Sequence, residues 1–544
     1  MALVWGGVIS VQAQDSISAK FCSPFDFPLQ LSANFGELRP NHFHNGLDIK
    51  TQGVVGKPIH SIADGYVSRI LVLHGGYGQA LFITHPNGYT SVYGHVVSFA
   101  PQIQKYLRQY QYEHETFVCD VRPEVDQIKV KAGEIVALSG NEGASAGPHL
   151  HLELRRNDNG DYVDPMPFFK EHLKDTKAPV ASLVGLYPVP GKGVIDGSGR
   201  KKIVGVNALA QRFNAWGTIY TGIAAKDYMD GTGNFYGVHS VTLYVDSVLV
   251  FRSVTDEVSP DENRMINGFT DYEELMKNRR LIMRSHKLPG NKLRLLHTDE
   301  NRGLVTIDEE RDYRFMYVLE DNFGNRRKYR FTVRGRKQEI PEMKNDSCKT
   351  LCWNRTNVIQ EPGMEFVIPR GMLYDDAPLS TAVAGDSSNL SFEYTLDARH
   401  TPLHGFCQLA IGIRNDTLAD KSKYYIRNRV GKWTSSVGGK YDNGWMKADI
   451  RQWGNFSVAV DTIAPSVTPI GQNLWRTRRD IRFRVSDGQT GIASYKVLID
   501  GKFVLKKGVL IIQDPDKVKK GVPHTAEVIV ADNCGNVTRK QYKF

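Results

Sequence analysis

The chain has 544 residues, which is too many for a single hydrophobic core, so several domains are expected. A hydrophobic content of 41% excludes a largely disordered protein, and the net charge of +10 favours an anionic partner such as a cell-wall polymer, a nucleic acid or a membrane surface. The basic residues are scattered, however, and the short clusters at 326–328 and 476–479 are not interleaved with aromatic residues. This distribution argues against nucleic-acid binding.

Residues 1–14 are uncharged and contain an apolar run followed by the small-residue step Val11-Gln12-Ala13. This pattern is typical of a signal peptide, although the usual positive charge before the apolar run is missing. A buried or disordered N-terminal strand is the alternative. No other stretch approaches the length of a membrane span. We therefore expect a periplasmic or secreted protein with no transmembrane span.

Six cysteines form an even set that is compatible with an oxidising compartment, and they allow fifteen pairings. Cys348 and Cys352 do not form a zinc-finger pair, because no second Cys or His pair follows at the required spacing. Free buried thiols are the alternative.

The segment 20–172 contains short alternating runs separated by turn signals such as Asn87-Gly88, which predicts an antiparallel β domain. One stretch departs from this pattern. Residues 101–115 place apolar side chains at helical spacing and predict a helix that either walls the site or is a surface insertion.

Beyond residue 170 a weak internal repeat appears. The segment starting at Asp175 (Asp-Thr-Lys-Ala-Pro) is echoed at Asp461, and the Asp-Asn-x-Gly-Asn segment starting at Asp321 is echoed at Asp532. Hairpin signals lie between these markers, at 241–251 and 495–505. The sequence therefore predicts a mainly β chain, in which the first domain is followed by Ig-like β-sandwich modules over 178–336 and 463–544 and by a third β-rich module over 340–460.

Two fragments of the first domain carry metal-binding side chains. His44 and Asp48 stand four residues apart, in a stretch that reads as a turn entering a strand. His149 and His151 stand two apart in an alternating run, so both would face one cleft while Leu150 enters the core. Two imidazoles and a carboxylate, with one further imidazole beside them, are the side chains of a catalytic zinc site that keeps a position open for water.

An imidazole that is not bound to the metal would take or return a proton, or stabilise an oxyanion. His149 and His95 are the candidates for that role. His60 and His85 are interpreted as structural, and His42 as a possible neighbour of the metal ligands.

Three stretches together resemble the LytM/lysostaphin-type zinc endopeptidases: Phe35 to Asp48, Asn87 to His95, and Ser139 to Glu153. The resemblance covers about residues 30 to 170. It implies that His44, Asp48 and His151 bind one Zn²⁺ per chain and that His149 and His95 are catalytic. It also implies a small antiparallel β fold with a groove and cleavage of peptidoglycan peptides. A long insertion after His95 and an alanine at position 146 depart from the family pattern.

Two other functions compete with this one. A non-catalytic wall-binding protein, or an activator of other wall hydrolases, could use the same fold. Such relatives have typically lost zinc ligands, whereas this chain retains the full set. A protease for a non-wall protein, with the β modules binding its target, is the third possibility.

Overall fold

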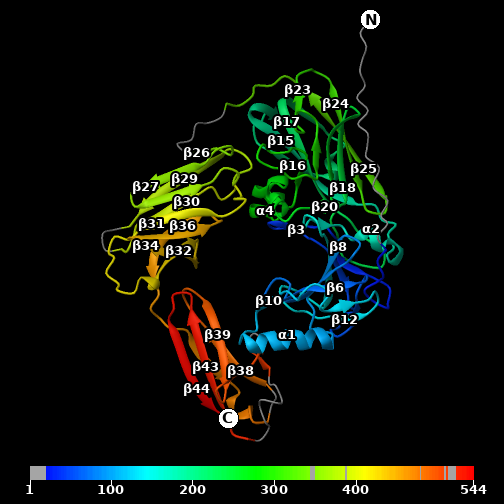
Figure 1. Cartoon of the computed structure of the whole chain (residues 1–544). Coiled ribbons are helices and arrows are strands. Elements are labelled where there is room, and N and C mark those ends of the chain that lie inside the picture. Colours follow the sequence, from blue (N-terminus) through cyan, green and yellow to red (C-terminus); the bar gives the residue numbers. More distant parts are fainter. Residues whose placement is uncertain (1–19, 343–348, 386–388, 478–479, 508–509, 513–521) are drawn as a thin grey trace.

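The computed structural model describes residues 20–342, 349–385, 389–477, 480–507, 510–512 and 522–544. The chain is mainly β, as predicted, and its β-rich parts follow one another in a ring (Figure 1). The predicted signal peptide lies outside the described residues. Within them, no helix combines the length and the apolar character needed to cross a membrane.

The first part is built on a ten-stranded sheet. Its main path runs in the order β1 (Leu31–Ala33), β4 (Leu47–Lys50), β13 (His149–Arg156), β8 (Tyr89–Gly94), β7 (Gln79–Thr84), β6 (Gly65–Val72) and β10 (Cys119–Val121). Three short strands pair beside this path: β11 (Lys129–Val130) with β6, β14 (Tyr162–Val163) with β13, and β20 (Glu257–Val258) with β14. Two smaller sheets accompany it: β5 (Pro58–His60), β12 (Ile135–Leu138) and β9 (Ser98–Phe99), and the pair β2 (Leu38–Arg39) and β3 (His42–Phe43).

The predicted helix after His95 is α1 (Pro101–Glu113). Ile103 and Leu107 are buried on one face, and proline at the first position suits a helix start because it needs no amide partner there. None of the described residues that line the candidate cleft comes from α1, so the interpretation as a wall of the site is wrong. Two short helices, α2 (Met166–Phe169) and η1 (Lys170–His172), end this part.

The second part has its own ten-stranded sheet. The main path is β16 (Lys202–Gly205), β15 (Val180–Ile195), β17 (Arg212–Lys226), β25 (Arg326–Gly335), β24 (Asp312–Glu320), β18 (Ser240–Val245), β19 (Val248–Val254) and β22 (Leu296–Thr298). Both β21 (Met283–Arg284) and β23 (Val305–Ile307) pair with β17. The helical segments are η2 (Val206–Ala208), η3 (Asn263–Met265), α3 (Ile266–Phe269) and α4 (Tyr272–Asn278).

The first two parts exchange core residues. Phe35 and Phe43, from the first part, pack in the core of the second. Met229 and Tyr236, from the second part, pack in the core of the first. All four side chains are at least 95% buried, so this junction is a continuous apolar interior and not a flexible linker.

The third part packs two sheets around one core. One sheet contains β26 (Lys349–Leu351), β29 (Ala377–Ala384), β30 (Glu393–Asp397), β36 (Gly454–Val460), β32 (Tyr424–Val430) and β33 (Trp433–Gly438). The other contains β27 (Asn357–Glu361), β28 (Met364–Ile368), β31 (Cys407–Gly412), β35 (Trp445–Ile450) and β34 (Lys440–Asp442). One short helix, η4 (Lys421–Lys423), precedes β32.

The fourth part has two four-stranded sheets. They are β37 (Ser466–Ile470), β38 (Asp480–Ser486), β42 (Leu510–Ile512) and β41 (Lys506–Lys507), and β40 (Lys502–Phe503), β39 (Ile492–Ile499), β43 (Thr525–Asp532) and β44 (Val537–Lys543), with η5 (Gln472–Leu474) after β37. It closes the ring against the end of α1, where Lys496 pairs with Glu115 and Phe503 contacts Tyr112 (Figure 1).

Two further predictions concern turns and cysteines. Both hairpins form as predicted, β18 with β19 around Asp246-Ser247 and β39 with β40 around Asp500-Gly501. The five cysteines within the described residues are free thiols, so the structure favours the alternative to disulfides, while Cys348 lies outside the described residues. The Ig-like nature of the modules and the predicted domain boundaries stay predictions.

Candidate metal centre

Strand register brings the predicted metal ligands together. Strand β13 lies between β4 and β8, and His151 stands directly opposite Asp48 on one side and Gly94 on the other. Leu150 points into the core with no exposed surface, as the alternation predicts. Gly46 admits the close approach of β13, because a Cβ there would lie 2.4 Å from the carbonyl oxygen of Leu152.

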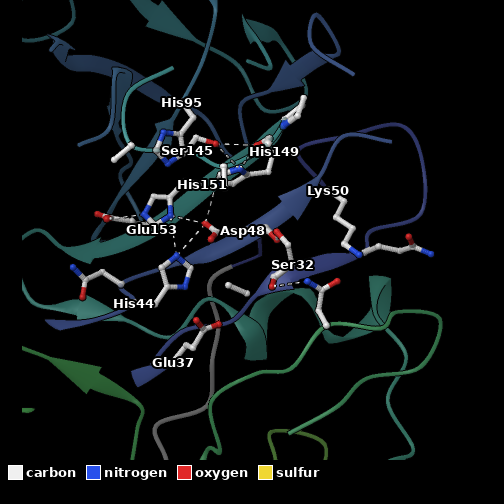
Figure 2. A pocket seen from close by; sticks show the side chains of 18 of the residues that line it. Ser32, Glu37, His44, Asp48, Lys50, His95, Ser145, His149, His151 and Glu153 are labelled. Atoms are coloured by element: carbon white, nitrogen blue, oxygen red, sulfur yellow. Dashed lines mark hydrogen bonds and ion pairs between the residues drawn. The ribbon is translucent and has the colours of Figure 1, made fainter. Parts of the chain in front are cut away.

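Three donor atoms converge at this point (Figure 2). Nε2 of His44 lies 3.0 Å from Oδ1 of Asp48 and 3.1 Å from Nδ1 of His151. The same Nδ1 lies 2.7 Å from Asp48 Oδ1. A tetrahedral zinc ion with bonds of about 2.1 Å would hold its ligand atoms roughly 3.4 Å apart. The cluster therefore fits such an ion after its donor atoms move apart by roughly 0.3 to 0.7 Å.

The three members of the cluster differ in their protonation. Burial opposes ionisation of Asp48, but the neighbouring His44 and the hydrogen bond from His151 hold the pKa of its carboxyl well below the ordinary value. Burial lowers the pKa of His44. Burial opposes the charge on His151, but Asp48 and Glu153 outweigh it and raise the pKa of that ring to about 9, so a zinc ion would have to displace a proton from His151.

Backbone and side-chain contacts orient both imidazole ligands. Nδ1 of His44 donates to the carbonyl of Asn34 at 2.7 Å, which leaves the lone pair of Nε2 for a metal. Nε2 of His151 lies 2.9 Å from Oε1 of Glu153, on the far side of the ring from its donor atom Nδ1. Such outer hydrogen bonds fix the tautomer and the direction of a ligand.

Glu153 contacts the cluster through His151, and the sequence analysis assigned it no role. It is 1% exposed, and burial alone would raise its pKa, but Arg155 and His151 lower that pKa to about 2. Oε1 also accepts a hydrogen bond from Tyr77. The signal in the sequence is its position two residues after His151 on the same strand face.

His149 and His95, the two histidines expected to be catalytic, lie beside the cluster but are not among its three donor residues. Nδ1 of His149 donates to the carbonyl of Gly147 at 2.8 Å, and its Nε2 lies 3.5 Å from Asp48 Oδ1. Nδ1 of His95 donates to the carbonyl of Glu142 at 2.7 Å. The two ring centroids are 4.7 Å apart. In the neutral ring, each Nε2 is thus an acceptor available for chemistry.

His95 occupies a strained backbone conformation. Its φ of 61° lies in the left-handed region, which a residue with a side chain rarely adopts. Burial, together with the neighbouring His151 and His149, lowers the pKa of His95 to about 4, so the ring is neutral at pH 7. Strain of this kind persists where the surrounding structure holds a residue in a required position.

The remaining candidate histidines lie elsewhere. His60 contacts Gly133 and Asp26, and His85 contacts Asp64 and Ser91, as expected for structural residues. His42 lies at the rim of the cleft and contacts the Pro40 carbonyl, without a contact to the three ligands.

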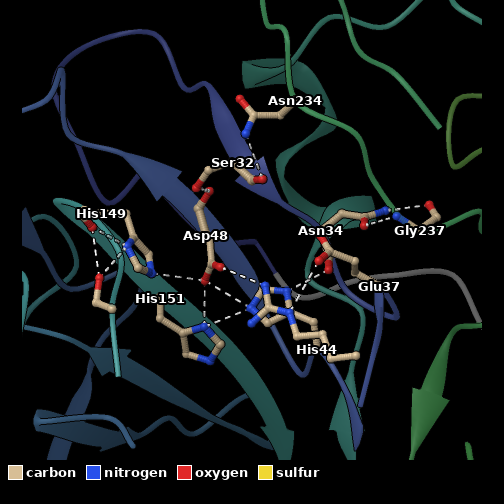
Figure 3. Close-up of polar contacts among 12 residues, drawn as sticks. Ser32, Asn34, Glu37, His44, Asp48, His149, His151, Asn234 and Gly237 are labelled. Carbon is tan, nitrogen blue, oxygen red and sulfur yellow. Dashed lines mark hydrogen bonds and ion pairs between the residues drawn. The ribbon is translucent and has the colours of Figure 1, made fainter. Parts of the chain in front are cut away.

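The cluster lies in an open cleft of about 1110 Å³. Most of the lining comes from the first part, including the loop that carries Ser145 and Gly147. Asn234 and Phe235, however, belong to the second part. Neighbouring Gly237 exchanges two hydrogen bonds with the Asn34 side chain, at 2.8 and 2.9 Å (Figure 3). The second part therefore shapes the cleft and buttresses the segment that orients His44.

Comparison with known proteins agrees with this geometry. Residues 42–112, which include His44, Asp48 and His95, match peptidase family M23. The chain contains an M23 peptidase domain. An uncharacterized metalloprotease of Haemophilus influenzae is 31% identical over 148 residues, which are 27% of this chain and 25% of the relative. The DD-carboxypeptidase/endopeptidase Mpg of Neisseria meningitidis is 31% identical over 150 residues, 28% and 27% of the two chains.

This chain thus spans about a quarter of the length of those curated relatives. Among solved structures, the catalytic domain of the M23 protein EnpA from Enterococcus faecalis is 28% identical over 27% of this chain and 95% of that one, with a TM-score of 0.20. Residues 348–461, which form most of the third part, match the Zu5-like domain.

Proposed function

We propose that this protein is a zinc-dependent endopeptidase that hydrolyses peptide bonds in the stems or cross-links of peptidoglycan, and that it acts in the periplasm or outside the cell. One observation carries the proposal: three metal-donor atoms and two further imidazoles converge at the floor of one open cleft. The relative Mpg is named as a carboxypeptidase and endopeptidase, and the net charge of +10 suits an anionic wall polymer.

His44, Asp48 and His151 would hold the zinc ion. When bound, zinc lowers the pKa of a water molecule and polarises a carbonyl group. The two non-ligand histidines then supply proton transfer and orientation. Nε2 of His149, which faces the ligand cluster at 3.5 Å from Asp48, would accept a proton from the attacking water and return it to the leaving amine.

His95 plays a different part. Its low pKa keeps the ring neutral, so Nε2 accepts a hydrogen bond and would orient the water or the substrate amide. Glu153 holds the ring of His151 in place through Nε2 and so keeps Nδ1 directed at the cluster.

The test is digestion of purified, cross-linked peptidoglycan by the zinc-loaded protein. We expect new amino termini, and mass spectrometry of the released muropeptides identifies the bond that is cut. The His149→Ala variant, loaded with the same amount of zinc, is the matched control. A wild-type protein that binds zinc but releases no amino termini from any wall type would contradict the proposal and favour a non-catalytic wall-binding or hydrolase-activating function. Cleavage of a protein substrate alone would favour a protease for a non-wall target.

A further inference from the structure

A second cluster of possible metal ligands lies at the junction of the first two parts. Asp175 belongs to the segment that leads into β15, Asp227 directly follows β17, and Asp321 directly follows β24. Oxygen atoms from the three carboxylates lie within 4.8 Å of one another. The residues are only 8%, 4% and 3% exposed, respectively. Three acidic side chains from distant segments are thus buried in one place.

Two oxygen atoms of this cluster lack a partner. Within the described part of the chain, neither Oδ2 of Asp175 nor Oδ1 of Asp227 has a hydrogen-bond partner, although both residues are more than nine-tenths buried. Asp321 differs, because its oxygens accept hydrogen bonds from the amides of residues 323 and 325 and from the side chain of Asn325. Unpaired buried carboxylate oxygens are costly and point to a missing ligand.

No basic side chain neutralises the cluster. In the described ranges, none of the three aspartates forms an ion pair with a lysine, arginine or histidine within 4.0 Å. Nζ of Lys177, the nearest candidate in sequence, donates to the carbonyl of Met229 at 3.0 Å instead. Burial and mutual repulsion raise the pKa of Asp175 to about 6 and that of Asp227 to about 8. The electrostatics thus favour a bound cation.

We propose that Asp175, Asp227 and Asp321 form a calcium site. The donors are all carboxylate oxygens, which hard cations prefer, and no imidazole or thiolate belongs to the cluster. Oxygen ligands about 2.3–2.6 Å from Ca²⁺ lie up to about 5 Å apart across the ion. The three oxygens lie within 4.8 Å of one another, which that span accommodates, and Mg²⁺ is held less often by a cage of protein ligands alone.

The fourth part contains a comparable arrangement. Asp461 and Asp532 start the two echoed sequence motifs, and together with Asp487 they form another group of converging carboxylates. There, however, the hydroxyl of Thr490 donates to Oδ2 of Asp461, and three backbone amides donate to Oδ2 of Asp487. Protein groups already satisfy those oxygens, so the proposal concerns the first cluster alone.

The position of the site gives it a structural consequence. The backbone of Asp227 forms two hydrogen bonds of 2.9 Å with the backbone of Tyr236 and closes the loop of residues 228–235. That loop supplies Asn234 and Phe235 to the candidate cleft. The hydroxyl of Tyr236 donates to the carbonyl of Leu31 in β1. A cation at Asp227 would thus hold the base of a loop that lines the cleft of the M23 domain.

Calcium binding to the full-length, zinc-loaded protein tests the proposal. We expect isothermal titration with CaCl₂ to show one equivalent of bound calcium in the wild type, and both Asp227→Asn and Asp321→Asn should lose it. Calcium should also raise the melting temperature of the wild type by several degrees more than that of either variant. Asp261→Asn, which changes an exposed aspartate of the same part, is the matched control and should bind as the wild type does.

Zinc content and near-ultraviolet circular dichroism show whether each variant is folded. Two variants are used so that the test still stands if one of them does not fold. Absence of calcium binding by the wild type would overturn the proposal. So would an unchanged number of calcium equivalents in both folded variants, or magnesium binding with calcium excluded. None of these readouts depends on peptidase activity.

Discussion

Nε2 of His151 lies 2.9 Å from Oε1 of Glu153, so a buried carboxylate holds one ligand of the candidate metal centre from behind. The contact depends on strand geometry, because residues two apart on β13 point to the same face. Arg155 in turn pairs with the other oxygen of Glu153 at 2.6 Å. The ligand is therefore held by a row of alternate residues along one strand.

This row leads to the first prediction. Glu153→Gln keeps the shape of the side chain but removes the charge that fixes the ring of His151, so zinc affinity should fall by about 10- to 100-fold. Competition with a chelator of known affinity measures it. Glu171→Gln, on the exposed surface of the same part, should leave the affinity unchanged. Equal affinities for the two variants would contradict the role given to Glu153.

The second prediction concerns the ligands. His151→Ala removes one of three protein donors and should abolish stoichiometric zinc binding, which elemental analysis of the purified protein measures. His60→Ala removes a histidine of the same part that lies outside the cluster and should retain about one zinc per chain. Full zinc retention by His151→Ala would refute the ligand assignment.

The third prediction separates binding from chemistry. His149→Ala and His95→Ala should each retain zinc and lose about 10²- to 10⁴-fold in the rate of peptide cleavage, because each removes an imidazole that handles protons beside the cluster. His42→Ala, at the rim of the cleft, is the control and should lose far less. Wild-type rates in both variants would leave the two histidines without a catalytic role.

The fourth prediction concerns stability and pH. Asp164 is buried at the junction and bonded to Asn322 of the second part at 2.7 Å. Burial raises its pKa from 3.8 to about 7. Between these values the folded state binds the proton more tightly than the unfolded state. Stability therefore falls as pH rises from 4 to 7, by at most about 1.4 kcal/mol per pH unit from this group.

Asp164→Asn should flatten that dependence and make the protein more stable than the wild type at pH 8, as measured by urea unfolding at several pH values. Asp158→Asn, at an exposed position nearby, should follow the wild-type curve. If Asp164→Asn kept the wild-type slope between pH 4 and 7, the assignment of this carboxyl would be wrong.

Local patterns were sufficient for much of the fold. Strict alternation around His149 predicted a strand with both histidines on one face, and β13 confirms it. Apolar spacing predicted the helix after His95, and turn residues predicted two hairpins. These signals arise from neighbouring residues, so they do not depend on contacts with the rest of the chain.

The features that could not be predicted from the sequence depend on contacts between distant segments. Phe35 is apolar, so burial is expected, but the sequence does not show that it packs in the core of the next part. Asp175 and Asp321 stood out as repeat markers, yet their convergence with Asp227 requires the tertiary fold. In the sequence Glu153 is one polar residue of an alternating strand, and nothing there shows that its side chain contacts His151.

The exchange of Phe35, Phe43, Met229 and Tyr236 across the first junction bears on which segment folds autonomously. The first part ends at η1, but a chain cut there would expose Phe35 and Phe43 and lose Gly237, which braces Asn34. We therefore expect the first two parts to unfold together as one cooperative unit, so that neither can be deleted or transplanted without the other.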